Sequence, residues 1–218
     1  MRIYQAEGDS DYIGIAFNSV EEVTPLREIE FEHTTLDPAH VVNIRYTFHE
    51  PEKDGVITDC PYAGAGSRLV LSQRACEALG PMLDQAGALV RLNPAHEMGY
   101  RMFVCYRHLD ALDTVQTKHQ EGFVDFITQY EFHDAIVEGV DIFRLSNRVG
   151  RLFVSEHFVQ ETRQHRLSGF RFRLLWSSDR GGVTLADSVM IHERFPPGYG
   201  STLREKRQAM RDLIASGR

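Results

Sequence analysis

The chain has 218 residues, of which 42% are hydrophobic and 25% charged, and its formal net charge is −7. This composition is typical of one ordinary globular domain, which buries roughly 70% of its unfolded surface and folds without crosslinks. It has no run of about 18 apolar residues, which argues against a membrane-spanning helix.

The cysteines and the first residues of the sequence indicate the cellular compartment. Cys60, Cys76 and Cys105 are odd in number, widely spaced and without a CxxC pair. This argues against a disulfide framework and a zinc ribbon, and it fits a reducing cytosol. Segment 1–12 has no apolar run of the kind that a signal peptide requires. We therefore expect a cytoplasmic protein.

The acidic charge is concentrated in the first quarter of the chain. Residues 1–60 hold 13 acidic and four basic residues, a local net charge of −9, whereas residues 61–218 have a net charge of +2. An acidic surface repels nucleic acid and attracts a basic partner. Charge that serves only solubility explains the same pattern.

Residues 2–60 are predicted to form a few strands joined by turns. Segment 27–33 (REIEFEH) alternates two apolar residues with three glutamates, and segment 41–49 (VVNIRYTFH) is rich in β-branched and aromatic residues. Segment 51–66 holds two prolines and three glycines, which favours a long loop.

The next predicted element is a helix that begins after Ser72, a favourable N-cap residue. Pro81 lacks an amide donor, so we expect the helix to end near Leu79 or a second short turn to open at Pro81. The inward positions of the helix are Ala75, Cys76, Leu79 and Leu83. Four strands are predicted after it, over residues 88–93, 100–106, 125–133 and 140–145.

Residues 152–176 predict a strand, a helix and a second strand. Ser155 is the expected N-cap of the helix and Gly169 its expected terminator. If the two strands lie parallel in one sheet, the crossover should be right-handed. The second strand alternates, which places Phe170, Phe172, Leu174 and Trp176 on one face.

The chain changes character after Trp176. Residues 177–188 are loop-like, residues 189–195 predict an edge strand, and residues 201–216 predict a terminal helix with a narrow apolar stripe. The resulting fold class is α+β, a single domain with a mixed or antiparallel sheet packed by two or three helices and a short C-terminal helix. Its parts are an acidic strand-rich region (1–60), a core (67–176) and a C-terminal extension (177–218).

Motifs for chemistry are sparse. The ten histidines include no HxxxH or HExxH pair, and segment 64–67 (GAGS) lacks the rest of a phosphate-binding loop. No GxSxG or SxxK motif occurs. The sequence therefore predicts no catalytic residue, no cofactor and no metal site.

The clearest polar feature is the alternating stripe Glu28, Glu30 and Glu32. Like charges about 7 Å apart on one strand face require solvent or cations. The stripe fits a solvated outer face, a docking strip for lysine or arginine of a partner, or a divalent-metal site. We assign partner binding to the acidic residues Asp9, Asp11, Glu21, Glu22, Glu28, Glu30 and Glu32.

Residues 67–176 resemble a known family. The segments SRLVLSQRACEAL, DALD, IFR, LFVSEHFV and GFRF are similar in order and spacing to the immunity-11 family of bacterial polymorphic toxin systems. The shared positions imply a core of Leu69, Leu71, Phe143, Phe153, Phe158, Phe170, Phe172 and Trp176.

The resemblance implies a protein that binds a cognate toxin and blocks its active site stoichiometrically. The expected partner has a basic surface or cleft, and no nucleic acid or membrane is expected to bind. Two alternatives remain open: an enzyme that reverses a toxin's modification, and a small-ligand or scaffold module.

Overall fold

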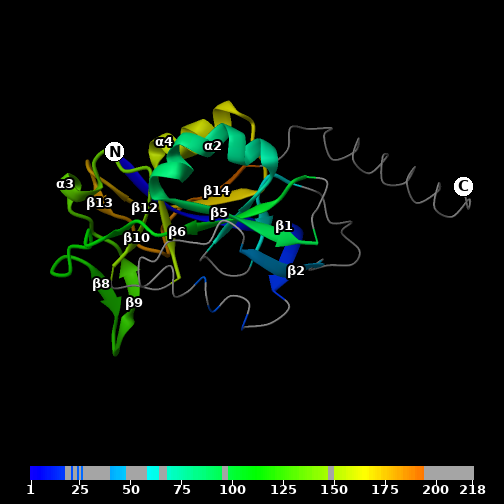
Figure 1. The fold of residues 1–218 in the computed structure, drawn as a ribbon. Helices are drawn as coiled ribbons and strands as arrows, with labels where there is room; N and C mark the ends of the chain where they lie inside the picture. Colours follow the sequence, from blue (N-terminus) through cyan, green and yellow to red (C-terminus); the bar gives the residue numbers. More distant parts are fainter. Residues whose placement is uncertain are drawn as a thin grey trace, which may run out of the picture.

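The computed structural model describes residues 1–17, 21, 24, 26, 40–47, 58–63, 68–94, 98–146 and 150–193 (Figure 1). Within these ranges, the side chains of residues 11–13, 45–47 and 123–125 are not described. Expectations for the segments at 27–33, 64–67 and 201–216 lie outside the described residues.

The described chain is built mainly of strands. In chain order these are β1 (Arg2–Phe17), β2 (Val41–Thr47), β3 (Pro61–Tyr62), β4 (Leu69–Leu71), β5 (Gly87–Asn93), β6 (Arg101–Cys105), β7 (His108–Leu109), β8 (Lys118–Gln120), β9 (Phe123–Gln129), β10 (Ile142–Leu145), β11 (Leu152–Ser155), β12 (Phe170–Ser177), β13 (Gly181–Gly182) and β14 (Met190–Glu193). The helices within the described residues are α2 (Gln73–Ala86), α3 (Asp134–Val137) and α4 (Glu156–Gln164).

Twelve strands form one mixed sheet, and β8 and β9 form a separate two-stranded sheet. The long path through the large sheet is β4-β6-β5-β2-β1-β11-β10-β7, and β12 and β3 also pair with β1. The pairs β1–β3, β2–β5 and β7–β10 are parallel and the others antiparallel. The α+β class with a mixed sheet is therefore confirmed. The short strand β3 lies in the segment that we predicted to be loop.

Strand β1 joins the two halves of the sheet. Its first residues pair with β11 on one side and β12 on the other, and its last residues pair with β2. Gln5, for example, lies opposite both Phe153 and Arg173. Because β11 and β12 are both antiparallel to β1, they are parallel to each other with β1 between them. The predicted strand–helix–strand unit therefore exists, but its strands are not neighbours.

Helix α2 confirms the predicted cap but not the predicted end. Ser72 Oγ accepts a hydrogen bond from the Ala75 amide at 3.1 Å. The helix continues through the exposed Pro81 to Ala86, so the prediction of an end near Leu79 is wrong. Proline inside a helix costs about 3 kcal/mol, whereas burying Met82 and Leu83 contributes roughly 1.5–3 kcal/mol each. Burial beyond the proline offsets its cost.

Helix α4 also begins as predicted and ends differently. Ser155 Oγ accepts from the Phe158 amide at 3.1 Å, as an N-cap should. The helix ends at Gln164, and Arg166 rather than glycine adopts the left-handed conformation, with φ of 49°. Gly169 is not the terminator. Its φ is 82°, and a Cβ there would collide with Thr58 Oγ1, so this glycine permits close packing instead.

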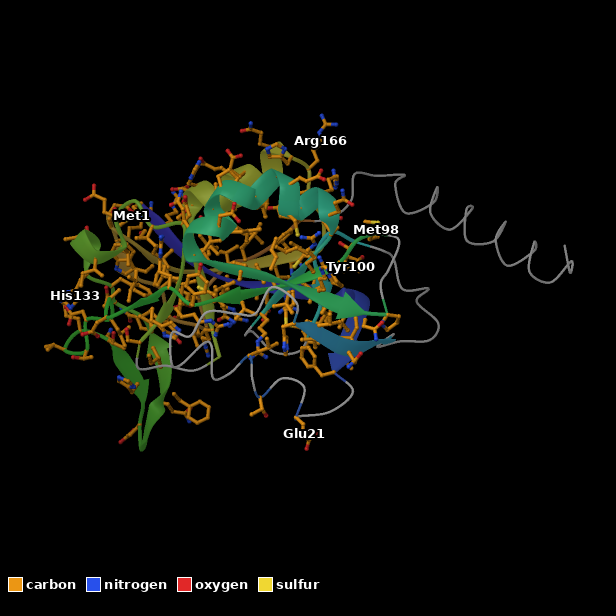
Figure 2. All side chains as sticks on the ribbon, in the orientation of Figure 1. Met1, Glu21, Met98, Tyr100, His133 and Arg166 are labelled. Carbon is orange, nitrogen blue, oxygen red and sulfur yellow. The ribbon has the colours of Figure 1, made fainter. Side chains whose placement is uncertain are left out.

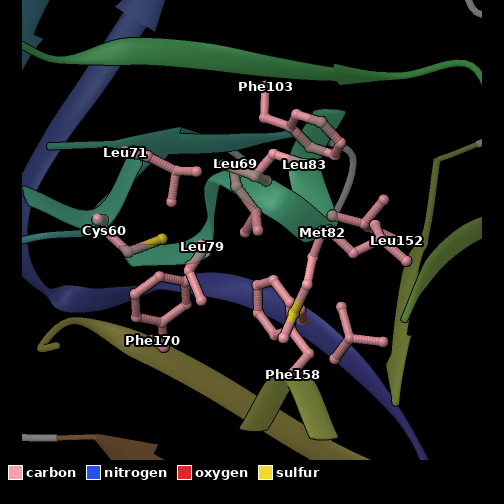
Figure 3. Packing of buried hydrophobic residues seen from close by; sticks show 14 of the residues in the cluster. Cys60, Leu69, Leu71, Leu79, Met82, Leu83, Phe103, Leu152, Phe158 and Phe170 are labelled. Carbon is pink, nitrogen blue, oxygen red and sulfur yellow. The ribbon is translucent and has the colours of Figure 1, made fainter. Parts of the chain in front are cut away.

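Helices α2 and α4 lie side by side over one face of the sheet (Figure 1). Between them and the sheet is a buried apolar cluster (Figure 3). Figure 3 shows Leu79 and Met82 of α2 facing Phe158 of α4 and Phe170 of β12. This cluster fixes both helices against the strands that run beneath them.

All eight predicted core residues are buried, but they belong to two clusters. Phe170 and Phe172 pack under the helices, whereas Trp176 packs in another cluster with Phe143 and Phe153. The prediction that Trp176 shares a face with Phe170 is therefore wrong. Ile3 pairs with Trp176 and Tyr4 with Leu174, so an extra residue lies between these pairs and reverses the alternation.

Candidate functional site

The acidic residues assigned to partner binding lie in different environments. Asp9 is fully buried, and its Oδ2 atom lies 2.8 Å from Nδ1 of His192 on β14. Asp9 therefore belongs to the interior rather than to an exposed acidic surface. Glu21 is exposed (Figure 2). Asp11 lies in β1 with an undescribed side chain, and the other assigned residues, Glu22, Glu28, Glu30 and Glu32, lie outside the described residues.

A second carboxylate, that of Asp59, is buried in a network of hydrogen bonds. Ser72 Oγ donates to Oδ1 at 2.7 Å, and the Ser168 amide and hydroxyl donate to Oδ2 at 3.0 and 3.1 Å. The Arg74 guanidinium forms an ion pair with the same carboxylate. Because both oxygens are occupied by structural donors, this carboxylate joins α2 to the loop after α4 and is not available as a general base.

An open pocket of about 370 Å³ lies at the start of α4. Three segments far apart in the sequence form it: Met1, residues 137 and 139–141 at and after the end of α3, and residues 155–157 and 160 of β11 and α4. The turn at residue 139 requires glycine, whose φ is 73°. The sequence indicated Ser155 only as a helix cap and gave no signal for the pocket, because its walls meet only in the folded chain.

The polar wall of this pocket is centred on Asp141. Its Oδ1 atom accepts from Ser155 Oγ at 2.6 Å and lies 3.1 Å from His157 Nδ1. A nucleophilic triad needs histidine between serine and the carboxylate. Here the carboxylate lies between serine and histidine, and Ser155 Oγ is also occupied as the cap. The three side chains therefore hold one another in place and do not form a catalytic relay.

Glu156 and Met1 also line the pocket. Glu156 Oε1 forms a 2.8 Å ion pair with Nη1 of Arg2. The Met1 amino group donates to Ser178 Oγ at 3.0 Å, which fixes the N-terminal residue beside the pocket. The apolar part of the lining comes from Met1, Val137 and Val140. The pocket thus combines carboxylate acceptors with aliphatic surface.

The hairpin of β8 and β9 projects from the body of the protein (Figure 1). Phe126 on β9 is 61% exposed, and the adjoining strand residue Ile127 is buried. Val115, in the turn before β8, is 92% exposed. Exposed large apolar side chains are common at protein-binding surfaces, although single ones occur on every protein.

Metal and thiol chemistry find little support in the described part of the chain. Among those residues, no group of three or more His, Cys, Asp or Glu is placed to hold a metal ion. Burial raises the pKa of the Cys76 thiol to about 11, and burial also raises the pKa of Cys60 well above its ordinary value. Thiols of this kind are poor nucleophiles at neutral pH.

Within the described residues, the structure contains no helix that is both long and apolar enough to cross a membrane. A comparison with curated proteins finds no match for this chain. The model of the immunity protein family Imm11 matches residues 42–175, which span more than half of the chain and nearly all of the block at 67–176. The protein therefore belongs to the Imm11 immunity protein family.

Proposed function

We propose that this protein binds one cognate antibacterial toxin and neutralises it by stoichiometric occlusion of the toxin's active site. The family match over residues 42–175 carries the proposal. The two polar clusters described above support the proposal. The carboxylate oxygens of Asp59 and the hydroxyl of Ser155 are occupied by structural contacts, so neither group is placed for catalysis. In such a protein the function resides in a complementary surface.

Binding of this kind is physically achievable for a domain of this size. An interface of about 1,600 Å² supports nanomolar or tighter affinity when a few well-packed anchors are present. The acidic residues of the N-terminal quarter, Asp11, Glu21, Glu22, Glu28, Glu30 and Glu32, are proposed to face a basic surface or cleft of the toxin. Opposite charges would accelerate the encounter and make it salt-dependent.

The test is a titration of the protein against the toxin domain encoded beside it, following toxin activity and the mass of the complex. Inhibition that saturates at a fixed molar ratio, with a stable complex, is the expected result. Protection at a small fraction of one equivalent, without a lasting complex, would instead show catalytic reversal of the toxin's damage and would overturn the proposal.

A further inference from the structure

In the pocket at the start of α4, one carboxylate oxygen has no hydrogen-bond partner among the described residues. Both hydrogen bonds that the described residues make to the Asp141 carboxylate reach Oδ1. Its Oδ2 atom accepts none from them and remains available to a ligand. Since Asp141 is held by Ser155 and His157, a donor that reaches Oδ2 meets a fixed carboxylate and does not have to order one.

The second acceptor of the pocket is Glu156. Its Oε1 atom is engaged by Arg2, while the side chain keeps 33% of its surface exposed. A carboxylate has two oxygens and about four acceptor positions, so one ion pair does not saturate it. A cation in the pocket would therefore meet one free carboxylate oxygen of Asp141 and the remaining acceptor capacity of Glu156.

The aliphatic part of the lining fits the stem of a long basic side chain. Val140 is partly exposed and Met1 is 39% exposed at the pocket, whereas Val137, which also borders it, is fully buried. Lysine and arginine pack their methylene stems on such surfaces while the charged head reaches polar groups. A volume of about 370 Å³ is at the small end of ligand sites, which suits one side chain better than a cofactor.

The charge around the pocket has the matching sign. Asp134 and Glu138 are exposed beside the lining segment, and Glu161 lies one turn further along α4. Together with the two lining carboxylates they make five acidic residues. Among the described basic groups at the pocket, the Arg2 guanidinium pairs with Glu156, the Met1 amino group donates to Ser178, and His157 lies against Asp141 and Glu161. The local potential therefore favours a positive ligand.

We propose that this pocket receives one arginine or lysine side chain of the bound toxin, held by the carboxylates of Asp141 and Glu156. The inference rests on the proposed function and names a point of contact within it. A basic residue inserted into a pocket and screened from water by its rim is the arrangement of a binding hot spot. Most of the pocket lies within the family-matched region, outside the acidic first quarter of the chain.

The experiment compares two identical substitutions on one helix. Gln160 lines the pocket, whereas Gln164 lies four residues further along α4, is exposed and is not part of the lining. Gln160→Lys places a positive charge in the pocket, and Gln164→Lys adds the same charge outside it. We expect Gln160→Lys to weaken toxin binding by at least about tenfold, and Gln164→Lys by less than about twofold. Circular dichroism checks that both variants are folded.

Two further measurements separate the outcomes. Gln160→Glu should bind the toxin at least as tightly as the unchanged protein. In a double-mutant cycle, one toxin residue, an arginine or lysine, should lose its effect when combined with Gln160→Lys. If both lysine variants weakened toxin binding equally, or if Gln160→Lys did not weaken it, the proposed role of the pocket would be overturned. Inhibition by the unchanged protein would remain intact in either case. An unchanged protein that fails to inhibit would refute the proposed function itself.

Discussion

Asp59 and Ser168 are 109 residues apart in the sequence and are joined by two hydrogen bonds, in which the Ser168 amide and hydroxyl donate to Asp59 Oδ2 at 3.0 and 3.1 Å. The Cys60 amide donates in return to the Ser168 carbonyl at 3.1 Å. These contacts connect the segment immediately before β3 to the loop between α4 and β12. One buried carboxylate thus connects the two helix-bearing parts of the fold.

Replacing this carboxylate should destabilise the protein. In Asp59→Asn, the side-chain NH2 group replaces one carboxylate oxygen and faces groups that are themselves donors. At least one buried hydrogen bond is therefore lost, together with the ion pair with Arg74. We expect the free energy of unfolding to fall by about 2–4 kcal/mol. Urea denaturation followed by the emission of Trp176, the single tryptophan, measures it. The exposed Asp84→Asn on α2 is the control, and an equal effect in both variants would contradict the assignment.

Gly169 and Gly122 form a matched pair for testing close packing. Both have positive φ, 82° and 78°, but a Cβ at Gly122 has open space, whereas one at Gly169 meets Thr58 and Cys60. Gly122→Ala should cost only the backbone strain, about 1–2 kcal/mol. Gly169→Ala should cost about 2 kcal/mol more, because the neighbouring chain must move. Thermal unfolding of the two variants measures both losses of stability, and equal losses would refute the packing argument.

The raised pKa of Cys76 has a consequence for alkylation. With a pKa of about 11, against an ordinary value of 9.0, the thiolate fraction at pH 8 is about one in a thousand. The alkylation rate at Cys76, measured by mass spectrometry of the folded protein, should therefore rise about tenfold per pH unit from pH 7.5 to 9.5. A plateau within that range would contradict the raised pKa. In urea the plateau should move down towards pH 9.

The same titration affects stability. The folded chain holds the Cys76 proton more tightly than the unfolded chain does, so the unfolded state loses protons first as the pH rises from about 9 to 11. Stability attributable to this group is complete below pH 9 and declines above it. Cys76→Ser should remove that part of the decline in urea denaturation measured between pH 8 and 10.5. An unaltered pH slope in the variant would contradict this.

The acidic residues that remain proposals can be tested through kinetics. Neutralising Glu28, Glu30 and Glu32 together with glutamine should slow toxin association by about tenfold at low salt and flatten its dependence on ionic strength. Stopped-flow association rates at several salt concentrations measure this.

The control for that test removes three exposed charges elsewhere, in Asp84→Asn, Asp110→Asn and Glu121→Gln. Equal slowing by both sets would show that net charge matters and the stripe does not. Unchanged association in the glutamine variant would exclude the stripe as the docking surface.

Many local elements could be predicted from short stretches of the sequence. Ser72 and Ser155 were identifiable as helix caps because a cap uses neighbouring amides, and their hydrogen bonds to Ala75 and Phe158 confirm them. The strands at β2, β5, β6, β10 and β12 followed from alternation and β-branched content. The family was recognisable because its segments occur in a fixed order. All of these signals lie within short stretches of chain.

How these elements meet depends on contacts between distant parts of the chain. The insertion of β1 between β11 and β12 joins residues more than 140 positions apart, and no local pattern encodes such a pairing. Asp9 looked like a surface carboxylate until the fold placed it against His192. The pocket around Asp141 exists because β1 and β11 are paired, which brings Met1 to the start of α4. Strand pairing and burial depend on distant partners, so these features arise only when the sheet is complete.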